Sequence, residues 1–181
     1  MEEKIQSKIL AIDPGTRHMG VAVLEESDLV FATVKVVKDK QMSSAEALKK
    51  TEKIIAQLIA SYNPNILAIE KTFFVQSKRS SLLNVMTEEI KKQARNKKLQ
   101  VYDYAPTTVR KFICEDGKAT KMKAASIIVN KHYPWLQRYL EKDLKKRWWE
   151  EKYWANMFDA IALGLTCLNK AGAQDSQGSA A

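Results

Sequence analysis

Three acidic residues lie beside or within apolar runs of the chain: Asp13, Glu70 and Asp159. A carboxylate in such surroundings is costly unless a cation pairs with it or a metal binds it. Clustered carboxylates raise one another's pKa until a cation neutralises them. Oxygen ligands without a supporting group of His or Cys favour Mg²⁺ or Mn²⁺ over zinc. Two such ions about 4 Å apart can stabilise the attacking and leaving oxygens of phosphodiester cleavage.

Each acid also has an ordinary structural explanation. Asp13 could belong to a turn, Glu70 could be a surface charge at a strand end, and Asp159 could pair with a lysine. All three explanations together are less probable than one shared site, although spacing alone does not decide between them. Asn156 lies three residues before Asp159 and therefore shares its helical face.

The elements that would position these residues can be read from the hydrophobic pattern. Short apolar and β-branched runs predict five strands, and the first three are close enough in sequence to form an antiparallel meander. Asn63-Pro64-Asn65 ends the first helix. The predicted strands are 8–12, 20–25, 29–37, 66–69 and 99–104, and the predicted helices are about 43–61, 80–98, from 106, 120–132 and 154–170.

This order of strands and helices predicts an α/β fold in which a five-stranded mixed sheet is flanked by helices. If the first and fourth strands are neighbours, Asp13 and Glu70 lie side by side at one edge of the sheet. The aromatic and charged segment 134–150 has no clear pattern, and its structure is not predicted.

Composition limits the class of protein. The 181 residues suit one domain, expected over residues 1–170, with a disordered tail over residues 171–181. The formal net charge of +9 suggests a polyanionic partner such as nucleic acid. Cys114 and Cys167 lie far apart, which predicts free thiols and a reducing, cytoplasmic location. No apolar run has membrane-spanning length, so no membrane partner is expected.

Basic and aromatic residues gather in two places. Lys91, Lys92, Arg95, Lys97 and Lys98 occupy one predicted helix, and Lys142, Lys145, Lys146 and Arg147 precede Trp148, Trp149, Tyr153 and Trp154. Such residues can bind phosphates and stack on unpaired bases, although lysine runs are usually solvated faces. Trp154 is expected in the core, while Trp148 and Trp149 have even odds of touching DNA or a partner subunit. His132 is not expected to act, and His18 is a candidate to support Asp13.

Several blocks together resemble the RuvC-type Holliday junction resolvases. The similarity begins with Leu10-Ala-Ile-Asp-Pro-Gly-Thr-Arg-His-Met-Gly-Val-Ala-Val23 and continues with Tyr62-Asn-Pro-Asn-Ile-Leu-Ala-Ile-Glu-Lys-Thr-Phe-Phe74. Further blocks are Tyr104-Ala-Pro-Thr-Thr-Val-Arg-Lys111, Gly117-Lys-Ala-Thr-Lys121 and Asp159-Ala-Ile-Ala162. They follow the family's order and extend from about Lys8 to Thr166, which makes the resemblance fairly specific.

The resemblance implies an RNase H-like fold, a homodimer and nicking of four-way DNA junctions with Mg²⁺ or Mn²⁺, two ions in each site. It implies that Asp13, Glu70 and Asp159 are the catalytic and metal-binding acids and that Lys121 is catalytic. Phe73 or Phe74 resembles the aromatic residue that stacks near the junction centre. Arg110 and Lys121 match two functional lysines, and with Lys111 and Lys118 they complete the implied DNA-binding set.

One departure concerns Asn156, where the family commonly has an acid or a histidine. An amide oxygen can bind Mg²⁺, but it carries no charge, so weaker metal affinity is expected. Three explanations stay open: an active natural variant, which we favour, a binding protein that has lost cleavage, or an engineered inactivation.

Two rival functions follow. One is a non-catalytic protein that binds branched DNA with the same fold. The other is a YqgF-type RNA-processing nuclease, which explains Glu70-x-x-Phe-Phe74 and Lys121 less well. A sugar- or acetate-kinase-like protein would need a second, duplicated domain, and the chain is too short for that.

Overall fold

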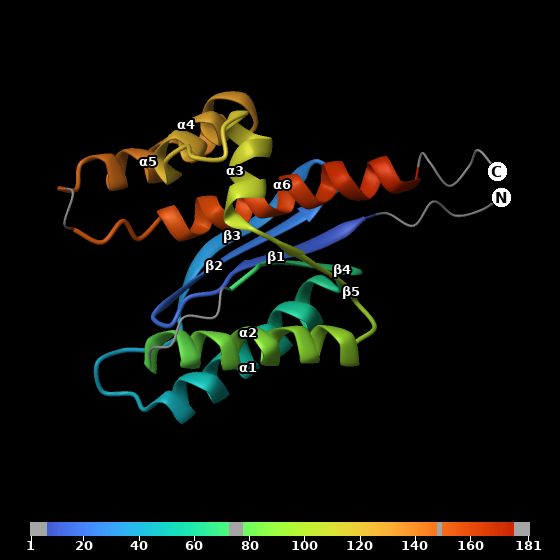
Figure 1. Ribbon diagram of the computed structural model, residues 1–181, viewed down its shortest axis with the longest axis vertical. Coiled ribbons are helices and arrows are strands. Elements are labelled where there is room, and N and C mark those ends of the chain that lie inside the picture. Colours follow the sequence, from blue (N-terminus) through green and yellow to red (C-terminus); the bar gives the residue numbers. More distant parts are fainter. Residues whose placement is uncertain (1–6, 73–77, 148–149, 176–181) are drawn as a thin grey trace.

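The computed structural model describes residues 7–72, 78–147 and 150–175, with the side chains of 78–80 and 171–175 excepted. A single sheet forms the middle layer of the molecule. Helices α1 and α2 cover one face of this sheet, and α3, α4, α5 and α6 lie over the other (Figure 1). The predicted five-stranded mixed sheet flanked by helices is confirmed.

The sheet has the strand order β3-β2-β1-β4-β5. Antiparallel pairing joins β1 to β2 and β2 to β3, so the predicted meander is confirmed. Parallel pairing joins β1 to β4 and β4 to β5. The strands are β1 Lys8–Asp13, β2 His18–Glu25, β3 Asp28–Val36, β4 Ile66–Glu70 and β5 Gln100–Tyr104.

The helices occur close to their predicted positions. They are α1 Ser44–Tyr62, α2 Lys78–Asn96, α3 Pro106–Cys114, α4 Lys121–Lys131, α5 Gln137–Leu144 and α6 Ala155–Asp175, and a short 3₁₀ helix, η1, covers Pro134–Leu136. The predicted N-terminus of α1 is confirmed. Ser43 caps it, and the Glu46 side chain accepts a hydrogen bond from the Ser43 backbone at 2.7 Å.

Two differences concern the last third of the chain. The segment without a predicted structure contains η1 and α5, whose buried Leu136 and Leu140 join the core. Helix α6 continues to Asp175, five residues beyond its predicted end at Lys170. Alanine and glutamine in this stretch favour helix, which explains the extension.

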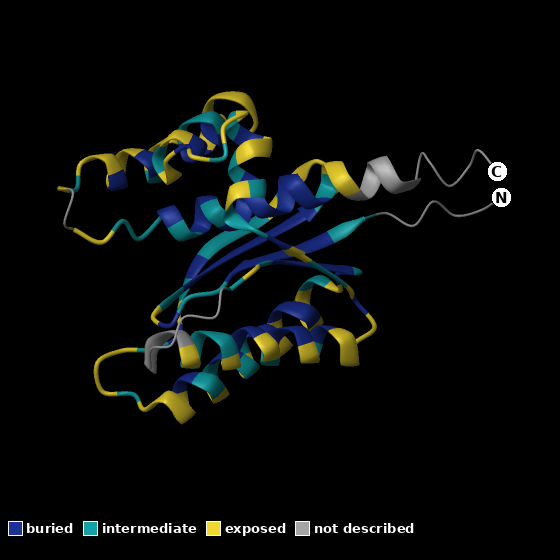
Figure 2. Ribbon diagram, viewed as in Figure 1, coloured by how far each residue is buried: buried dark blue, intermediate teal, exposed yellow. Residues whose placement is uncertain are grey.

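Burial is concentrated on both faces of the sheet (Figure 2). Ile9, Ala11 and Leu24 pack with α4 and α6, whereas Leu10 and Ile12 pack with α1 and α2. Because successive side chains of a strand point to opposite faces, β1 contributes to both cores. This double burial fixes β1 at the centre of the sheet, and Asp13 is its last residue.

Candidate active site

Asp13 and Glu70 end two adjacent parallel strands. The register pairs Ile12 of β1 with Ile69 of β4, so the two acids follow at the same edge of the sheet. Asp13 is buried, with 7% of its surface exposed, and Glu70 is half-buried. The sheet therefore places these two predicted site residues side by side.

Asp159 reaches this edge because α6 packs closely on the meander. The sheet register pairs Asp13 with Gly20 of β2. A Cβ atom on Gly20 would lie 1.8 Å from the main-chain oxygen of Asn156 and 3.3 Å from the Cβ of Ala160. The absence of a side chain at Gly20 lets the first turns of α6 approach the strand, and Asp159 lies in those turns.

The electrostatics show that the three acids share one environment. Burial raises the pKa of Asp13 well above its usual range, and the charges of Asp159 and Glu70 raise it further. Burial also raises the pKa of Glu70, with a second contribution from Asp159. For Asp159 itself, burial again raises the pKa. The ionised forms of these carboxylates are therefore disfavoured unless a cation lies near them.

Lys121 and Arg110 partly compensate this charge. The Lys121 ammonium, at the start of α4, donates a hydrogen bond to Oδ2 of Asp159 and forms an ion pair with it. Lys121 lowers the pKa of all three acids, and Arg110 of α3 lowers those of Glu70 and Asp159. Partial burial lowers the pKa of Lys121, but Asp159 and Asp13 more than offset this, and the net shift is upward.

The donor atoms fit a hard divalent cation in type and in charge. Carboxylate oxygens predominate, and their raised pKa values indicate a need for positive charge. Across residues 7–72, 78–147 and 150–175, however, no group of three His, Cys, Asp or Glu side chains is arranged to hold a metal ion. Lys121 occupies Oδ2 of Asp159, so a cation would compete with this ammonium.

Asn156 lies on α6 beside Asp159, as its spacing predicts. Its Nδ2 donates a hydrogen bond to the backbone oxygen of Tyr153 at 3.2 Å. This bond occupies the amide nitrogen and leaves the amide oxygen as the group that could bind a cation.

The N-terminus of α6 is held by a residue that sequence reasoning missed. Asp143 of α5 is fully buried, and its Oδ2 accepts a hydrogen bond from the backbone N–H of Ala155 at 2.7 Å. Lys146 lies 3.7 Å from the other oxygen. Burial raises the pKa of Asp143, although the hydrogen bonds from Ala155 and Trp154 oppose this. A carboxylate is thereby placed at the positive end of the helix that carries Asp159.

The remaining predicted DNA-binding residues have different positions. Lys111 and Lys118 are exposed on α3 and in the loop before α4, on the side of the sheet that carries Lys121. Phe73 and Phe74 lie outside the described residues, and so do Trp148 and Trp149. Trp154 packs against the core, with its ring 4.5 Å from that of Tyr139, which confirms its predicted role.

The predicted basic face of α2 needs correction at Lys91. Lys91 is buried and pairs with Asp103 at 2.8 Å, and Lys92 lies 3.4 Å from Glu89. Lys91 therefore stabilises the packing of α2 against β5, whereas Lys92 forms an ion pair on the helix surface. In the second basic stretch, Lys146 donates to the backbone oxygen of Glu151 at 2.5 Å.

The structure also describes the two histidines and the two cysteines. His18 Nδ1 lies 2.6 Å from Oε1 of Glu151, and its ring meets the Tyr153 ring edge-on at 5.1 Å. It thus contacts the segment before α6. His132 caps the end of α4. Cys114 and Cys167 are both free thiols, as predicted.

A carboxylate-rich edge on a β3-β2-β1-β4-β5 mixed sheet defines the class as an RNase H-like nuclease fold. The family model for "Crossover junction endodeoxyribonuclease RuvC" matches residues 9–133. The chain belongs to this family, whose members are Holliday junction resolvases.

Relatives and solved structures agree with this assignment. The crossover junction endodeoxyribonuclease RuvC of Hydrogenovibrio crunogenus is 29% identical over 126 residues, covering 68% of this chain and 73% of that protein. The protein of the same name from Prochlorococcus marinus strain MIT 9312 is 24% identical over 168 residues, covering 91% and 98%.

Two solved structures share the fold. Thermus thermophilus RuvC, solved in complex with Holliday junction substrate, superposes with a TM-score of 0.69 at 16% identity, covering 91% of this chain and 96% of that one. The yeast mitochondrial Holliday junction resolvase Ydc2 gives 0.67 at 10% identity, covering 90% and 78%. Within the described residues, no helix has the length and apolar character needed to cross a bilayer.

Proposed function

We propose that this protein is a metal-dependent endonuclease that nicks four-way or other branched DNA, as in recombination and repair. Membership in the resolvase family supports the activity. The observation that carries the proposal is the shared environment of Asp13, Glu70 and Asp159 beside Lys121. Uncompensated carboxylates at one sheet edge suit a site that gathers cations next to a phosphodiester.

The chemistry would be hydrolysis without a covalent enzyme intermediate. A water oxygen bonds to the scissile phosphorus while the bond from phosphorus to the 3′ oxygen breaks, and the 3′-hydroxyl leaves. Asp13, Glu70 and Asp159 would hold Mg²⁺ or Mn²⁺, two ions in the complete site, with the Asn156 amide oxygen as a neutral fourth ligand. Bound cations would neutralise charge that develops on the phosphate oxygens.

Lys121 and Arg110 supply positive charge beside the acids. Both side chains already lower the pKa of the acids, so both lie within electrostatic range of the reacting centre. When the carboxylates receive another cation, the Lys121 ammonium becomes free to contact the scissile phosphate. Placed there, it stabilises negative charge as the phosphate is attacked.

A homodimer would allow two nicks at symmetrical positions of a junction. Helix α2 offers a surface for this contact: a shallow cleft of about 570 Å³ is lined by Asn84, Val85, Glu88, Glu89, Lys92 and Arg95. Val85 is 50% exposed there, among charges of both signs. Such a mixed surface can be complementary to itself across a two-fold axis. Sedimentation of Val85→Glu against wild-type protein tests this, and an unchanged dimer would contradict it.

The function is tested with labelled four-way, three-way and linear duplex DNA, each with and without Mg²⁺. We expect nicks in the branched substrates alone and only with the metal. Binding of four-way junctions with no cleavage in Mg²⁺ or Mn²⁺ would favour the non-catalytic binder, which the neutral Asn156 makes the main rival. Cleavage of structured RNA in preference to DNA junctions would favour the RNA-processing nuclease.

A further inference from the structure

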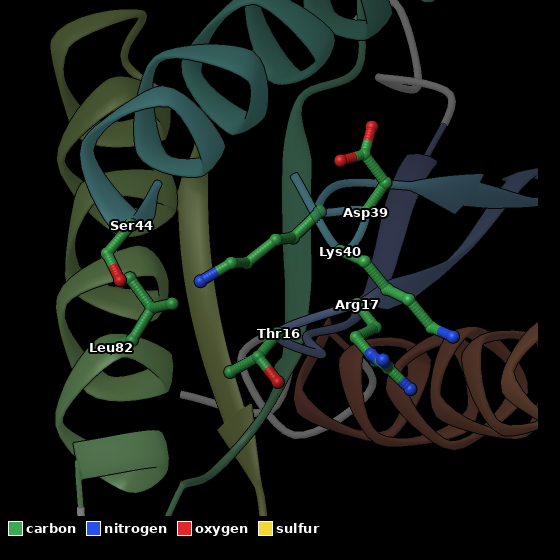
Figure 3. A pocket seen from close by; sticks show the side chains of 7 residues that line it. Thr16, Arg17, Asp39, Lys40, Ser44 and Leu82 are labelled. Atoms are coloured by element: carbon green, nitrogen blue, oxygen red, sulfur yellow. The ribbon is translucent and has the colours of Figure 1, made fainter. Parts of the chain in front are cut away.

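A basic cleft lies next to the acidic edge, and none of the roles above uses it. The cleft has a volume of about 500 Å³ and is lined by Thr16, Arg17, Lys38, Asp39, Lys40, Ser44 and Leu82. It is formed by the turn after β1, the loop between β3 and α1, and the first turns of α1 and α2 (Figure 3). Thr16 and Arg17 belong to the turn that follows Asp13, so the cleft lies at the edge of the sheet where β1 ends.

The cleft carries uncompensated positive charge. Arg17, Lys38 and Lys40 form no ion pair with any residue that the structure describes. Asp39, the acid among the lining residues, is engaged within its own loop. Its Oδ1 accepts hydrogen bonds from the backbone N–H groups of Gln41 at 2.9 Å and Met42 at 3.0 Å. In Figure 3 its side chain points away from those of Arg17 and Lys40.

Backbone hydrogen bonds join the loop that carries Lys38 and Lys40 to the turn that carries Arg17. The backbone oxygen of Arg17 accepts hydrogen bonds from the N–H groups of Val37 at 2.8 Å and Lys38 at 3.4 Å. Val37 is fully buried in the core, and this burial anchors the start of the loop. These contacts tie the loop between β3 and α1 to the turn after the catalytic strand. The backbone of Lys38 is therefore tied to the turn that follows Asp13, and Lys40 lies two residues further along the same loop.

The other lining groups suit a phosphodiester. The hydroxyl groups of Thr16 and Ser44 can donate hydrogen bonds to phosphate oxygens, and Ser44 opens α1, whose positive end adds to the field. Leu82 offers an apolar contact for a sugar. A nucleotide unit of a DNA strand combines an anion with such an apolar face.

We infer that this cleft binds a backbone phosphate of the DNA strand that runs on from the scissile phosphate. The inference rests on the proposed function, because it assumes that DNA occupies the acidic edge. It assigns Arg17, Lys38 and Lys40 to holding one arm of the substrate in place. Since phosphate contacts position a duplex without reading its sequence, the cleft sets where the strand lies and not which bases it carries.

The test compares Lys38→Gln/Lys40→Gln with Lys49→Gln/Lys53→Gln. The control pair removes two exposed lysines of α1 that do not line the cleft. Binding of a four-way junction is measured in Ca²⁺, which we expect not to support cleavage, over a range of salt concentrations. The cleft variant should raise Kd roughly tenfold and reduce the slope of log K against log salt by about 1 to 2. The control pair should change Kd and the salt slope by less than a third of these amounts.

The outcomes separate the two proposals. Wild-type protein that neither binds nor cuts junctions would overturn the proposed function itself. Wild-type protein that does both, beside a cleft variant with the same Kd and salt slope as the control pair, would overturn the cleft assignment alone. The cleft assignment would also be overturned if the cleft variant lost affinity for inorganic phosphate, measured by calorimetry, but kept its affinity for the junction. Melting curves should show that both variants are folded.

Discussion

Gly20 of β2 lies directly against the main-chain carbonyl of Asn156 in α6. A Cβ atom at Gly20 would lie 2.5 Å from the carbonyl carbon and even closer to its oxygen. Because these neighbours are backbone atoms, they cannot turn aside as a side chain could. The packing that brings Asp159 to Asp13 thus depends on a position with no side chain.

Gly20→Ala should push α6 away from the sheet and separate Asp159 from Asp13. We expect cleavage to fall roughly 100-fold, since small misplacements at a reacting centre have large effects. Overpacking should also lower the free energy of unfolding by about 1–3 kcal/mol. Initial rates on a four-way junction and urea unfolding measure the two effects.

Gly164→Ala is the matched control. A Cβ atom there would meet Cδ1 of Leu24 at 2.4 Å, which is the end of a flexible side chain. This variant should lose stability yet keep more activity per folded molecule. Equal activity of the Gly20→Ala protein and the wild type would contradict the packing argument.

Asp13→Asn should abolish cleavage and stabilise the metal-free protein at neutral pH. A raised pKa in the folded state means that this carboxyl binds its proton more tightly when folded than when unfolded. Stability is then greatest below the unfolded pKa of about 4 and falls as pH rises toward the folded value. Removing the charge should raise the Tm at pH 7 by a few degrees, or about 1 kcal/mol.

The gain in Tm should grow as the pH rises from about 4, because the penalty develops between the unfolded pKa and the raised folded pKa of Asp13. Asp28→Asn serves as the control, since Asp28 is exposed and pairs with Glu25 at the end of the sheet opposite to Asp13. Thermal scans in a chelator measure the effect. A Tm that falls at pH 7, with no pH-dependent gain, would show that the Asp13 carboxylate is satisfied without metal.

Much of this arrangement could be predicted from the sequence. Short apolar and β-branched runs predicted the five strands, and the positions of Asp13 and Glu70 predicted a common edge on the condition that the first and fourth strands are neighbours, which they are. Local patterns suffice there because burial repeats with the period of the element. Gly20 is the first residue of the predicted strand 20–25, and nothing local indicates that another backbone approaches it.

Asp143 could not be predicted in the same way. Its charge lies in a segment rich in Lys and Glu, where an acid normally faces solvent. Only the packing of α5 beside the start of α6 buries it and supplies the Ala155 N–H. The paired Lys91 was misjudged for a similar reason, since its partner Asp103 belongs to β5.

Asp143→Leu should destabilise the protein by about 1–3 kcal/mol, because it leaves the N–H groups at the start of α6 without their acceptor. Asp143→Asn keeps an acceptor oxygen and removes a buried charge, so it should cost less. Urea unfolding of both variants, with Lys145→Gln as an exposed control at the C-cap of the same helix, measures the difference. Equal stability of the Leu and Asn variants would show that the cap is dispensable.

Lys121→Met should lower cleavage roughly 100-fold, as expected when one charged donor leaves a reacting centre. It should also move the acidic limb of the pH–rate profile to higher pH. The reason is that Lys121 lowers the pKa of Asp13, Glu70 and Asp159, so its loss makes all three harder to ionise. Lys131→Met on the same helix is the control. A profile that drops in height without moving would mean that Lys121 does not act through these acids.

Mn²⁺ binding, followed by electron paramagnetic resonance, tests most directly whether the three acids form one metal site. Asp13→Asn, Glu70→Gln and Asp159→Asn should each weaken binding at least tenfold, whereas Asn156→Asp should strengthen it by adding a charged ligand. Asp28→Asn should bind like the wild type. If the wild-type protein binds Mn²⁺ and the three variants bind it equally well, the acids do not share a cation and the account is contradicted.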